Sequence, residues 1–255
     1  MGFNVAAESY DRYMGRFSSQ LSGGIADLAG LRPGQRALDV GCGPGALTAE
    51  LVARLGAEHV AAVDPSESFV AAVRVRHPGV AIARATAEAL PYDAATFDVT
   101  LAQLVVHFMA DAVAGLAEMR RVTRPGGTVA ASVWDYGGGR GPVSPFWDAV
   151  RPLDPGVHDE SELAGAREGS LASLFAAAGL TAIETGTLEA TVAYATFDDW
   201  WDQYTQGVGP GGAYVARLDP ERRDAAREAC RGAMPEAPFT ITAVAWACRG
   251  TVPSA

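Results

Sequence analysis

Three glycines and an aspartate are spaced in a way that could hold a nucleoside. Gly41, Gly43 and Gly45 follow a short apolar run that contains Asp39, and a helical pattern comes directly after them. Because glycine has no Cβ atom, such a strand-to-helix turn lets the backbone approach a ligand closely, with the free N–H groups of the helix start facing it. Asp64 ends the next apolar run, where a carboxylate can accept hydrogen bonds from both hydroxyls of a ribose.

Spacing alone leaves the cofactor open. Gly41, Gly43 and Ala46 formally satisfy the G-x-G-x-x-G/A pattern of dinucleotide sites, and a different adenosine-containing cofactor fits the same turn. An ordinary turn with Asp64 as a helix-capping residue is a further interpretation, since anionic side chains also favour helix N-termini. The glycines and Asp64 therefore indicate a nucleoside site without choosing its occupant.

His107 is the candidate general base. It follows the fourth apolar run, on the side of the sheet where ligands bind, and the usual pKa of histidine suits proton transfer near neutral pH. The competing interpretation of His107 is a pocket-lining or packing residue. Metal chemistry has no support, because the three cysteines are far apart and form no CxxC pair, so we expect neither a zinc site nor a disulfide framework.

Strand and helix patterns alternate through the first half of the chain and predict an α/β fold. Strands are expected at 36–40, 59–63, 80–83, 97–101, 128–133, 181–194 and 239–248, and helices at 6–30, 66–76, 111–123 and 170–178. The segment 197–235 is expected to be mostly helical with a turn at 207–212, and 136–145 is expected to be a loop. The alternation implies βαβ units, hence a mostly parallel sheet with helices on both faces.

Composition narrows the classes of function. The formal net charge of −10 argues against nucleic acid as a partner, because phosphate contacts need clustered Lys and Arg. No apolar stretch approaches the roughly 20 residues that cross a bilayer, and the first residues lack a signal-peptide pattern, so we expect a cytoplasmic protein without membrane insertion. We expect one domain over 1–255, with an N-terminal helical segment at 1–30 and an insertion at 196–238, the cap, that covers the substrate side of the site.

Several blocks resemble the motifs of class I S-adenosylmethionine-dependent methyltransferases, in the branch that methylates small molecules. The block 38–45 (LDVGCGPG) resembles their first motif and 63–66 (VDPS) their second. The blocks 87–91 with 97–99, and 120–127, are similar to the segments after the third strand and before the fifth. The stretch 10–16 (YDRYMGR) is similar to an N-terminal signature of this branch. The resemblance implies a Rossmann-like seven-stranded sheet of order 3-2-1-4-5-7-6, its last strand antiparallel.

The resemblance also implies which residues hold the cofactor. Asp39 would lie near the methionine amino group and Gln103 near the methionine end, while Asp64 would hold the ribose. Thr86 is a departure, because the family usually has an acidic residue at that position. The full set of implied cofactor-binding residues is Tyr13, Arg16, Asp39, Gly41, Cys42, Gly43, Gly45, Asp64, Pro65, Ser66, Ala87, Glu88 and Gln103.

The resemblance therefore implies transfer of a methyl group from S-adenosylmethionine to a small molecule, in a monomer or homodimer. Positioning can supply much of the rate, about 7–11 kcal/mol in well-oriented model reactions, so a base is needed only if the acceptor must lose a proton. The expected acceptor-binding residues are Tyr10, His107, Trp134, Trp201 and Tyr204, and none of them selects among carbon, oxygen, nitrogen and sulfur acceptors. The alternatives are a non-catalytic cofactor- or partner-binding module and an NAD-dependent oxidoreductase.

Overall fold

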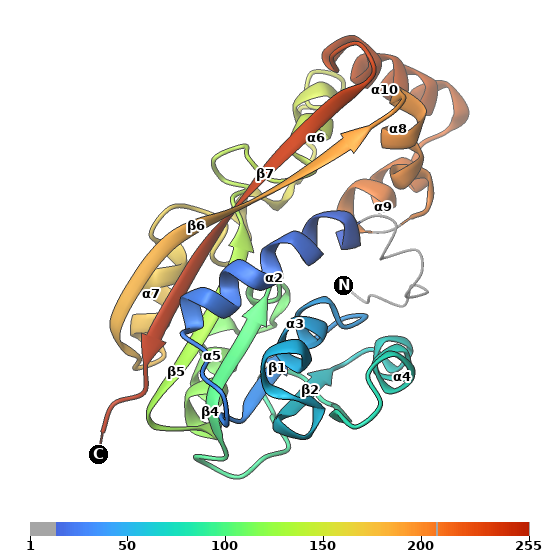
Figure 1. Ribbon diagram of the computed structural model, residues 1–255. Coiled ribbons are helices and arrows are strands. Elements are labelled where there is room, and N and C mark those ends of the chain that lie inside the picture. Colours follow the sequence, from blue (N-terminus) through green and yellow to red (C-terminus); the bar gives the residue numbers. More distant parts are fainter. Residues whose placement is uncertain (1–13, 208, 255) are drawn as a thin grey trace.

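Seven strands form one sheet in the computed structural model, which describes residues 14–207 and 209–254 (Figure 1). The strand order is β3-β2-β1-β4-β5-β7-β6. Strands β1 to β5 pair in parallel, and β7 is antiparallel to both of its neighbours. This confirms the Rossmann-like architecture and the expected order. The strands are β1 (Ala37–Val40), β2 (Val60–Asp64), β3 (Ala81–Arg84), β4 (Phe97–Gln103), β5 (Thr123–Trp134), β6 (Thr181–Tyr194) and β7 (Phe239–Thr251).

Helices cover both faces of this sheet, with α2 crossing one face while α5 and α7 lie on the other (Figure 1). The α-helices are α2 (Arg16–Ala29), α3 (Ala46–Leu55), α4 (Glu67–Arg76), α5 (Ala112–Val122), α6 (Ser144–Val150), α7 (Ser170–Ala177), α8 (Phe197–Thr205), α9 (Gly209–Arg217) and α10 (Pro220–Ala233). Short 3₁₀ turns are η2 (Ala57–His59), η3 (Val106–Phe108) and η4 (Glu160–Glu162).

Two expected irregular segments are shorter than predicted. The glycine-rich stretch 207–212 was expected to be a turn, but α9 begins within it at Gly209. Helix α6 begins at Ser144, inside the expected loop 136–145, with Pro145 in its first turn. Proline is well tolerated there because the N–H groups of a first turn have no partner within the helix. Glycine and proline residues alone therefore do not predict where α6 and α9 begin.

The central strands are buried on both faces. Every residue of β1 and of β2 is buried, whereas the edge strand β3 has no buried residue. Parallel strands with helices on both sides are expected to be apolar along their whole length, as the sequences ALDV and VAAVD nearly are. The two acidic residues in these strands, Asp39 and Asp64, are therefore exceptions that need an explanation.

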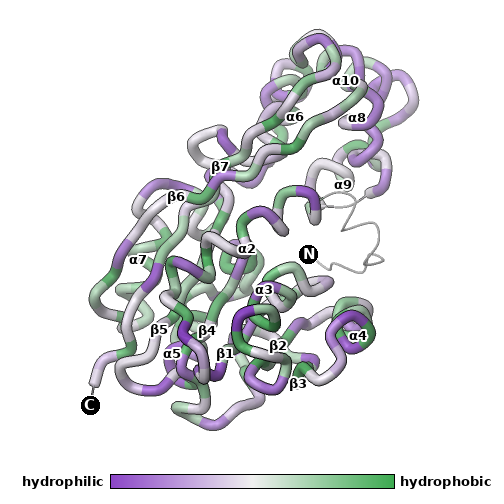
Figure 2. Tube along the Cα trace, viewed as in Figure 1, coloured by the Kyte–Doolittle hydropathy of each residue, from purple (hydrophilic) through white to green (hydrophobic). Residues whose placement is uncertain are grey.

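Strands β6 and β7 extend beyond the rest of the sheet. Trp134 at the end of β5 pairs with Ala245, while residues 239–243 of β7 pair only with β6. Helices α6, α8 and α10 gather around this projecting ribbon, with α9 below them (Figure 1). Helix α10, at the top of the view, is largely hydrophilic (Figure 2). The connection from β6 to β7, at 195–238, thus consists largely of helices. None of the described helices is long and apolar enough to cross a membrane.

Candidate functional site

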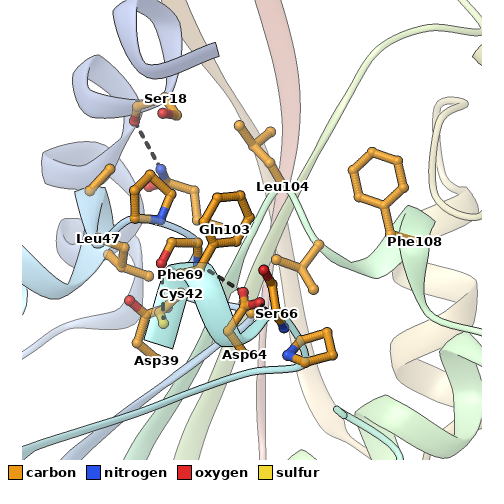
Figure 3. A pocket seen from close by; sticks show the side chains of 16 residues that line it. Ser18, Asp39, Cys42, Leu47, Asp64, Ser66, Phe69, Gln103, Leu104 and Phe108 are labelled. Carbon is orange, nitrogen blue, oxygen red and sulfur yellow. Dashed lines mark hydrogen bonds between the residues drawn. The ribbon is translucent and has the colours of Figure 1, made fainter. Parts of the chain in front are cut away.

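A cavity of about 320 Å³ opens at the carboxyl ends of β1, β2 and β4 (Figure 3). Ligands of open parallel sheets bind at this edge, where the loops after the strands converge. Residues from the glycine turn, from the ends of β2 and β4 and from α2 line the cavity. They are Ser18, Asp39, Gly41, Cys42, Gly43, Pro44, Ala46, Leu47, Asp64, Pro65, Ser66, Phe69, Gln103, Leu104, Val105 and Phe108.

The glycine turn uses backbone conformations that favour glycine. Gly41, Gly43 and Gly45 have φ values of 70°, 52° and 103°. The N–H groups of Gly41 and Cys42 donate to the carbonyl of Val63 at 2.8 and 3.0 Å, which fastens the turn to β2. A Cβ atom on Gly41 would lie 2.5 Å from the side chain of Val105, whereas one on Gly43 would meet nothing within 4 Å. Gly41 is thus needed for packing, and Gly43 leaves open space at the cavity.

Asp64 connects the glycine turn to the start of α4. Its carboxylate accepts hydrogen bonds from the N–H of Gly43 at 2.9 Å and from the N–H of Ser66 at 2.8 Å. Ser66 occupies the N-cap position of α4, but its own side chain makes no capping hydrogen bond. Burial raises the pKa of Asp64, and the two N–H groups oppose that rise. The same carboxylate therefore holds the turn and faces the cavity.

Asp39 is the second carboxylate of the cavity and is almost completely buried. The hydroxyl of Thr48 in α3 donates a hydrogen bond to Asp39 Oδ2 at 2.6 Å. Burial raises the pKa of Asp39 to about 7, and the nearby Asp64 adds to the rise. Burial and these two carboxylates also raise the pKa of the Cys42 thiol. Such a site favours a ligand that brings positive charge or hydrogen-bond donors to Asp39 and Asp64.

Gln103 carries an unused acceptor. Its Nε2 donates to the carbonyl of Ser18 at 2.9 Å, which ties the end of β4 to α2. Its Oε1 is buried and has no partner among the described residues. Buried polar atoms are normally hydrogen-bonded, so this oxygen is suited to accept a hydrogen bond from a ligand in the cavity.

Four of the expected cofactor residues within the described chain do not line this cavity, namely Arg16, Gly45, Ala87 and Glu88. Arg16 forms an ion pair with Asp199 of α8 at 3.3 Å and lies over the ring of Tyr194 at 4.6 Å, so it binds the β6–α8 corner instead. The carboxylate of Glu88 accepts from the N–H of Ala110 at 2.8 Å, at the approach to α5. Ala87 is buried in the apolar core. Tyr10 and Tyr13 lie outside the described residues.

His107 does not line the cavity either, although its neighbours Val105 and Phe108 do. Its ring is buried, 3.9 Å between centroids from Phe108 and 5.9 Å from Tyr136. Burial lowers the pKa of His107 to about 3, and Nδ1 has no partner within the described chain. A base this weak and enclosed does not fit the expected removal of a proton from an acceptor.

The expected acceptor-binding rings are packed inside the protein. Trp134, Trp201 and Tyr204 are buried and absent from the lining of the cavity. Tyr204 stacks on Phe146 of α6, with centroids 4.2 Å apart and planes inclined by 18°. Trp134 meets Phe17 of α2 edge to face at 6.1 Å. The aromatic residues of 197–214 thus form an apolar core between α6, α8 and α9.

Sequence reasoning missed part of the lining. Ser18, Leu47, Phe69, Leu104, Val105 and Phe108 all face the cavity, and none belongs to a glycine or acidic motif. Phe108 had the clearest signal, since it directly follows His107 beyond the fourth strand. Its side chain is 39% exposed, an unusual state for a phenylalanine. In the described part of the chain, no group of three or more His, Cys, Asp and Glu residues is arranged to hold a metal ion.

Comparison with known proteins places the glycine turn in a recognised domain. Residues 38–131 match the model of a family described as a methyltransferase domain. The chain is 36% identical over 128 residues to a malonyl-[acyl-carrier protein] O-methyltransferase of Erwinia billingiae, covering 50% of this chain and 49% of that protein. It is 41% identical over 101 residues to a demethylmenaquinone methyltransferase of Beutenbergia cavernae, covering 40% and 41%. The chain thus spans about half the length, or less, of these curated relatives.

The fold resembles solved methyltransferases over nearly the whole chain. A phosphoethanolamine N-methyltransferase 2 of Haemonchus contortus, solved with S-adenosyl-L-methionine, superposes with a TM-score of 0.62 at 14% identity. The match covers 99% of this chain and 58% of that one. At this identity the similarity concerns the fold alone.

Proposed function

We propose that this chain, which belongs to the class I S-adenosylmethionine-dependent methyltransferases, transfers a methyl group from S-adenosylmethionine to a small-molecule acceptor. One observation carries the proposal. The carboxylate of Asp64 is held by the N–H of Gly43 within the matched domain, so that the glycine turn and the carboxylate expected to hold a ribose line one cavity. The curated relatives named above are methyltransferases, and their acceptors are small molecules or are attached to a carrier protein.

The cavity fits this cofactor in three respects. Its volume of about 320 Å³ is at the lower end of the roughly 300–1,000 Å³ usual for small-molecule sites. The open space at Gly43 leaves room for a ligand lying against the backbone. Asp39, Asp64 and the unpaired Oε1 of Gln103 present acceptors, and the cofactor brings an ammonium group, ribose hydroxyls and a sulfonium charge. Asp64 would hold the ribose, and Asp39 with Gln103 the methionine portion.

Methyl transfer asks the protein mainly for position. The cofactor, when bound, supplies an activated methyl group on a positively charged sulfur. The residues of this chain orient that group: the glycine turn and Asp64 set one end, while Gln103 is itself fixed by the carbonyl of Ser18. Leu104, Val105 and Phe108 give the cavity an apolar side, which suits a reaction in which positive charge disappears.

The acceptor is expected at the rim next to Phe108. This ring is partly exposed and lines the cavity from beyond the end of β4. We also propose that the cap at 196–238 borders the acceptor site, because Arg16 joins Asp199 of α8 to the helix whose Ser18 lines the cavity. In that arrangement Trp201 and Tyr204 act as the core of the cap and not as its contact surface. We further propose one cytoplasmic domain, monomeric or dimeric, without a nucleic-acid partner.

Thermal unfolding with added ligands tests the cofactor assignment. S-adenosylhomocysteine, the demethylated product, should raise the melting temperature in a concentration-dependent way, because a ligand that binds only the folded state stabilises it. NAD at the same concentrations should not. Stabilisation by NAD alone would overturn the proposal in favour of a dinucleotide-dependent oxidoreductase.

A further inference from the structure

A second cavity, of about 520 Å³, shares no lining residue with the first. It lies between the loop that follows β5, the helix α6 and the segment that ends in η4. Its volume is within the range of small-molecule sites. Tyr136 lines it, and the ring of His107 packs against both Tyr136 and Phe108, of which Phe108 lines the first cavity. The second cavity is therefore a separate space next to the proposed site of methyl transfer.

The two arginines of this cavity are already paired. Arg151 forms ion pairs with Asp159 and, at 3.4 Å, with Asp148. Arg167 forms an ion pair with Glu162. The guanidinium groups are thus engaged by carboxylates of the same cavity, and an anionic ligand would have to compete with those carboxylates.

Glu160 is left without a cation. It lines the cavity, its exposed fraction is 4%, and it accepts a hydrogen bond from the indole N–H of Trp147. Within the described residues, no Lys, Arg or His forms an ion pair with Glu160. Burial raises the pKa of Glu160 to about 7, and the neighbouring Asp159 adds to that rise. A buried carboxyl in such surroundings is stabilised by a positively charged partner.

Aromatic rings accompany this carboxyl. Trp147 donates to Glu160 and also lines the cavity, as does Tyr136. Tryptophan and tyrosine faces attract organic cations within about 6 Å, and an aromatic or aliphatic body can pack on the same rings. His158 lines the cavity as well and could accept a hydrogen bond.

We propose that the second cavity binds a small organic amine, whose ammonium group pairs with Glu160 and whose apolar body packs against Trp147 and Tyr136. This site goes beyond the proposed transfer of a methyl group, and it does not depend on the identity of the cofactor.

Calorimetric titration with three matched probes tests the charge requirement. Phenethylamine, 2-phenylethanol and phenylacetate have similar shapes and are cationic, neutral and anionic. We expect phenethylamine to bind at least about tenfold more tightly than the other two, as for a charge-assisted contact to a buried partner. Equal binding of the three probes, or no binding of phenethylamine at millimolar concentrations, would overturn the proposal.

Two isosteric variants test the position. Glu160→Gln retains an oxygen that can accept from Trp147 and should weaken phenethylamine binding about tenfold or more. Glu168→Gln is the matched control, because Glu168 is exposed and does not line the cavity, and it should change affinity by less than about threefold. An unchanged affinity in Glu160→Gln would contradict the assignment, and the probe series on the unaltered protein decides independently if that variant does not fold.

Competition and NMR locate the probe. The indole N–H signal of Trp147, identified by its loss in Trp147→Phe, should shift when phenethylamine binds. Saturation with S-adenosylhomocysteine should leave phenethylamine affinity unchanged, because the two cavities share no residue. Displacement of the amine by S-adenosylhomocysteine would instead assign the amine to the first cavity and overturn the second site, while leaving the proposed methyltransferase function intact.

Discussion

The carboxylate of Asp64 accepts a hydrogen bond from the backbone N–H of Gly43 at 2.9 Å, and this contact joins the ends of the neighbouring strands β1 and β2. Asp64 is 21 positions away in sequence and 6% exposed. The side chain is therefore oriented before a ligand arrives, since a second hydrogen bond from Ser66 holds its other oxygen. Preorganisation of this kind reduces the entropy that binding must overcome.

Replacing Asp64 should weaken cofactor binding. In Asp64→Ala, the N–H groups of Gly43 and Ser66 lose their acceptor, and the ribose loses its own. We expect affinity for S-adenosylhomocysteine, measured by calorimetry, to fall about 10- to 100-fold, the range for loss of hydrogen bonds to a charged group. The exposed Asp93→Ala is the control and should bind normally. Normal binding by Asp64→Ala would remove Asp64 from the cofactor site.

Two glycine variants should separate packing from binding. Both Gly41 and Gly43 have positive φ, so alanine at either position carries a strain of roughly 1–2 kcal/mol. Only at Gly41 does the new Cβ also overlap Val105, so the free energy of unfolding in Gly41→Ala should fall by roughly a further 1–3 kcal/mol. Gly43→Ala should unfold at a higher denaturant concentration than Gly41→Ala, yet lose cofactor affinity because its methyl group enters the cavity. The reverse order of stability would contradict this geometry.

The buried His107 should make stability depend on pH. Its pKa is about 3 in the folded protein and 6.5 in the reference state, so the unfolded chain takes up a proton first as the pH falls. The stability present above pH 6.5 is then lost towards pH 3. Between pH 7.5 and pH 5 the unaltered protein should lose about 2 kcal/mol more free energy of unfolding than His107→Leu. If denaturant titrations showed the same loss of unfolding free energy in both proteins over this pH range, the pKa of His107 would not be lowered by folding.

The same variant should retain much of its activity. If positioning dominates the reaction, turnover in His107→Leu should fall by less than about 100-fold, at or below the lower end of general-base contributions. Turnover is measured at saturating methyl donor, after calorimetry has shown normal cofactor binding. A loss of 1,000-fold or more would make proton removal by His107 essential, despite its enclosed position.

Truncating the cap aromatics should affect stability and not the cofactor. Tyr204 has no exposed surface and stacks on Phe146, so Tyr204→Ala should cost about 3–5 kcal/mol or unfold the cap locally. Affinity for S-adenosylhomocysteine should remain within about twofold, because Tyr204 does not line the cofactor cavity. Asp202→Ala, on the exposed face of the same helix, is the control. A large loss of cofactor affinity with unchanged unfolding would contradict the assignment of Tyr204 to the cap core.

The glycine turn could be predicted because its signals are local, whereas the order of the sheet was implied by the resemblance of several blocks to one family. Gly41 and Gly43 follow one apolar run, and Asp64 ends the next. Because the two strands are parallel, their carboxyl ends meet at the same edge of the sheet. The position of Arg16 could not be read in this way, since its partners Tyr194 and Asp199 are more than 170 residues away. His107 illustrates the same limit, because its burial depends on the ring of Tyr136 from the next strand's loop.

The cap shows a different reason for failure. An aromatic-rich segment is compatible both with a pocket wall and with an apolar core, and only the packing partner distinguishes them. For Tyr204 and Trp201 the partner is Phe146 of α6, a helix that was not predicted and whose first two residues were assigned to a loop. The position of Ser18 beside the cavity could not be predicted either. Ser18 contacts Gln103 through its backbone carbonyl, and a backbone carbonyl carries no residue-specific signal.

The most direct measurement follows a labelled methyl group from S-adenosylmethionine. The unaltered protein is incubated with the labelled donor and a metabolite extract, and the products are separated into small molecules and macromolecules. We expect label in a small molecule with the unaltered protein, and none above background with Gly43→Val, whose branched side chain would enter the cavity. Label that remains on the donor, or that appears only in the macromolecular fraction, would contradict transfer to a small molecule.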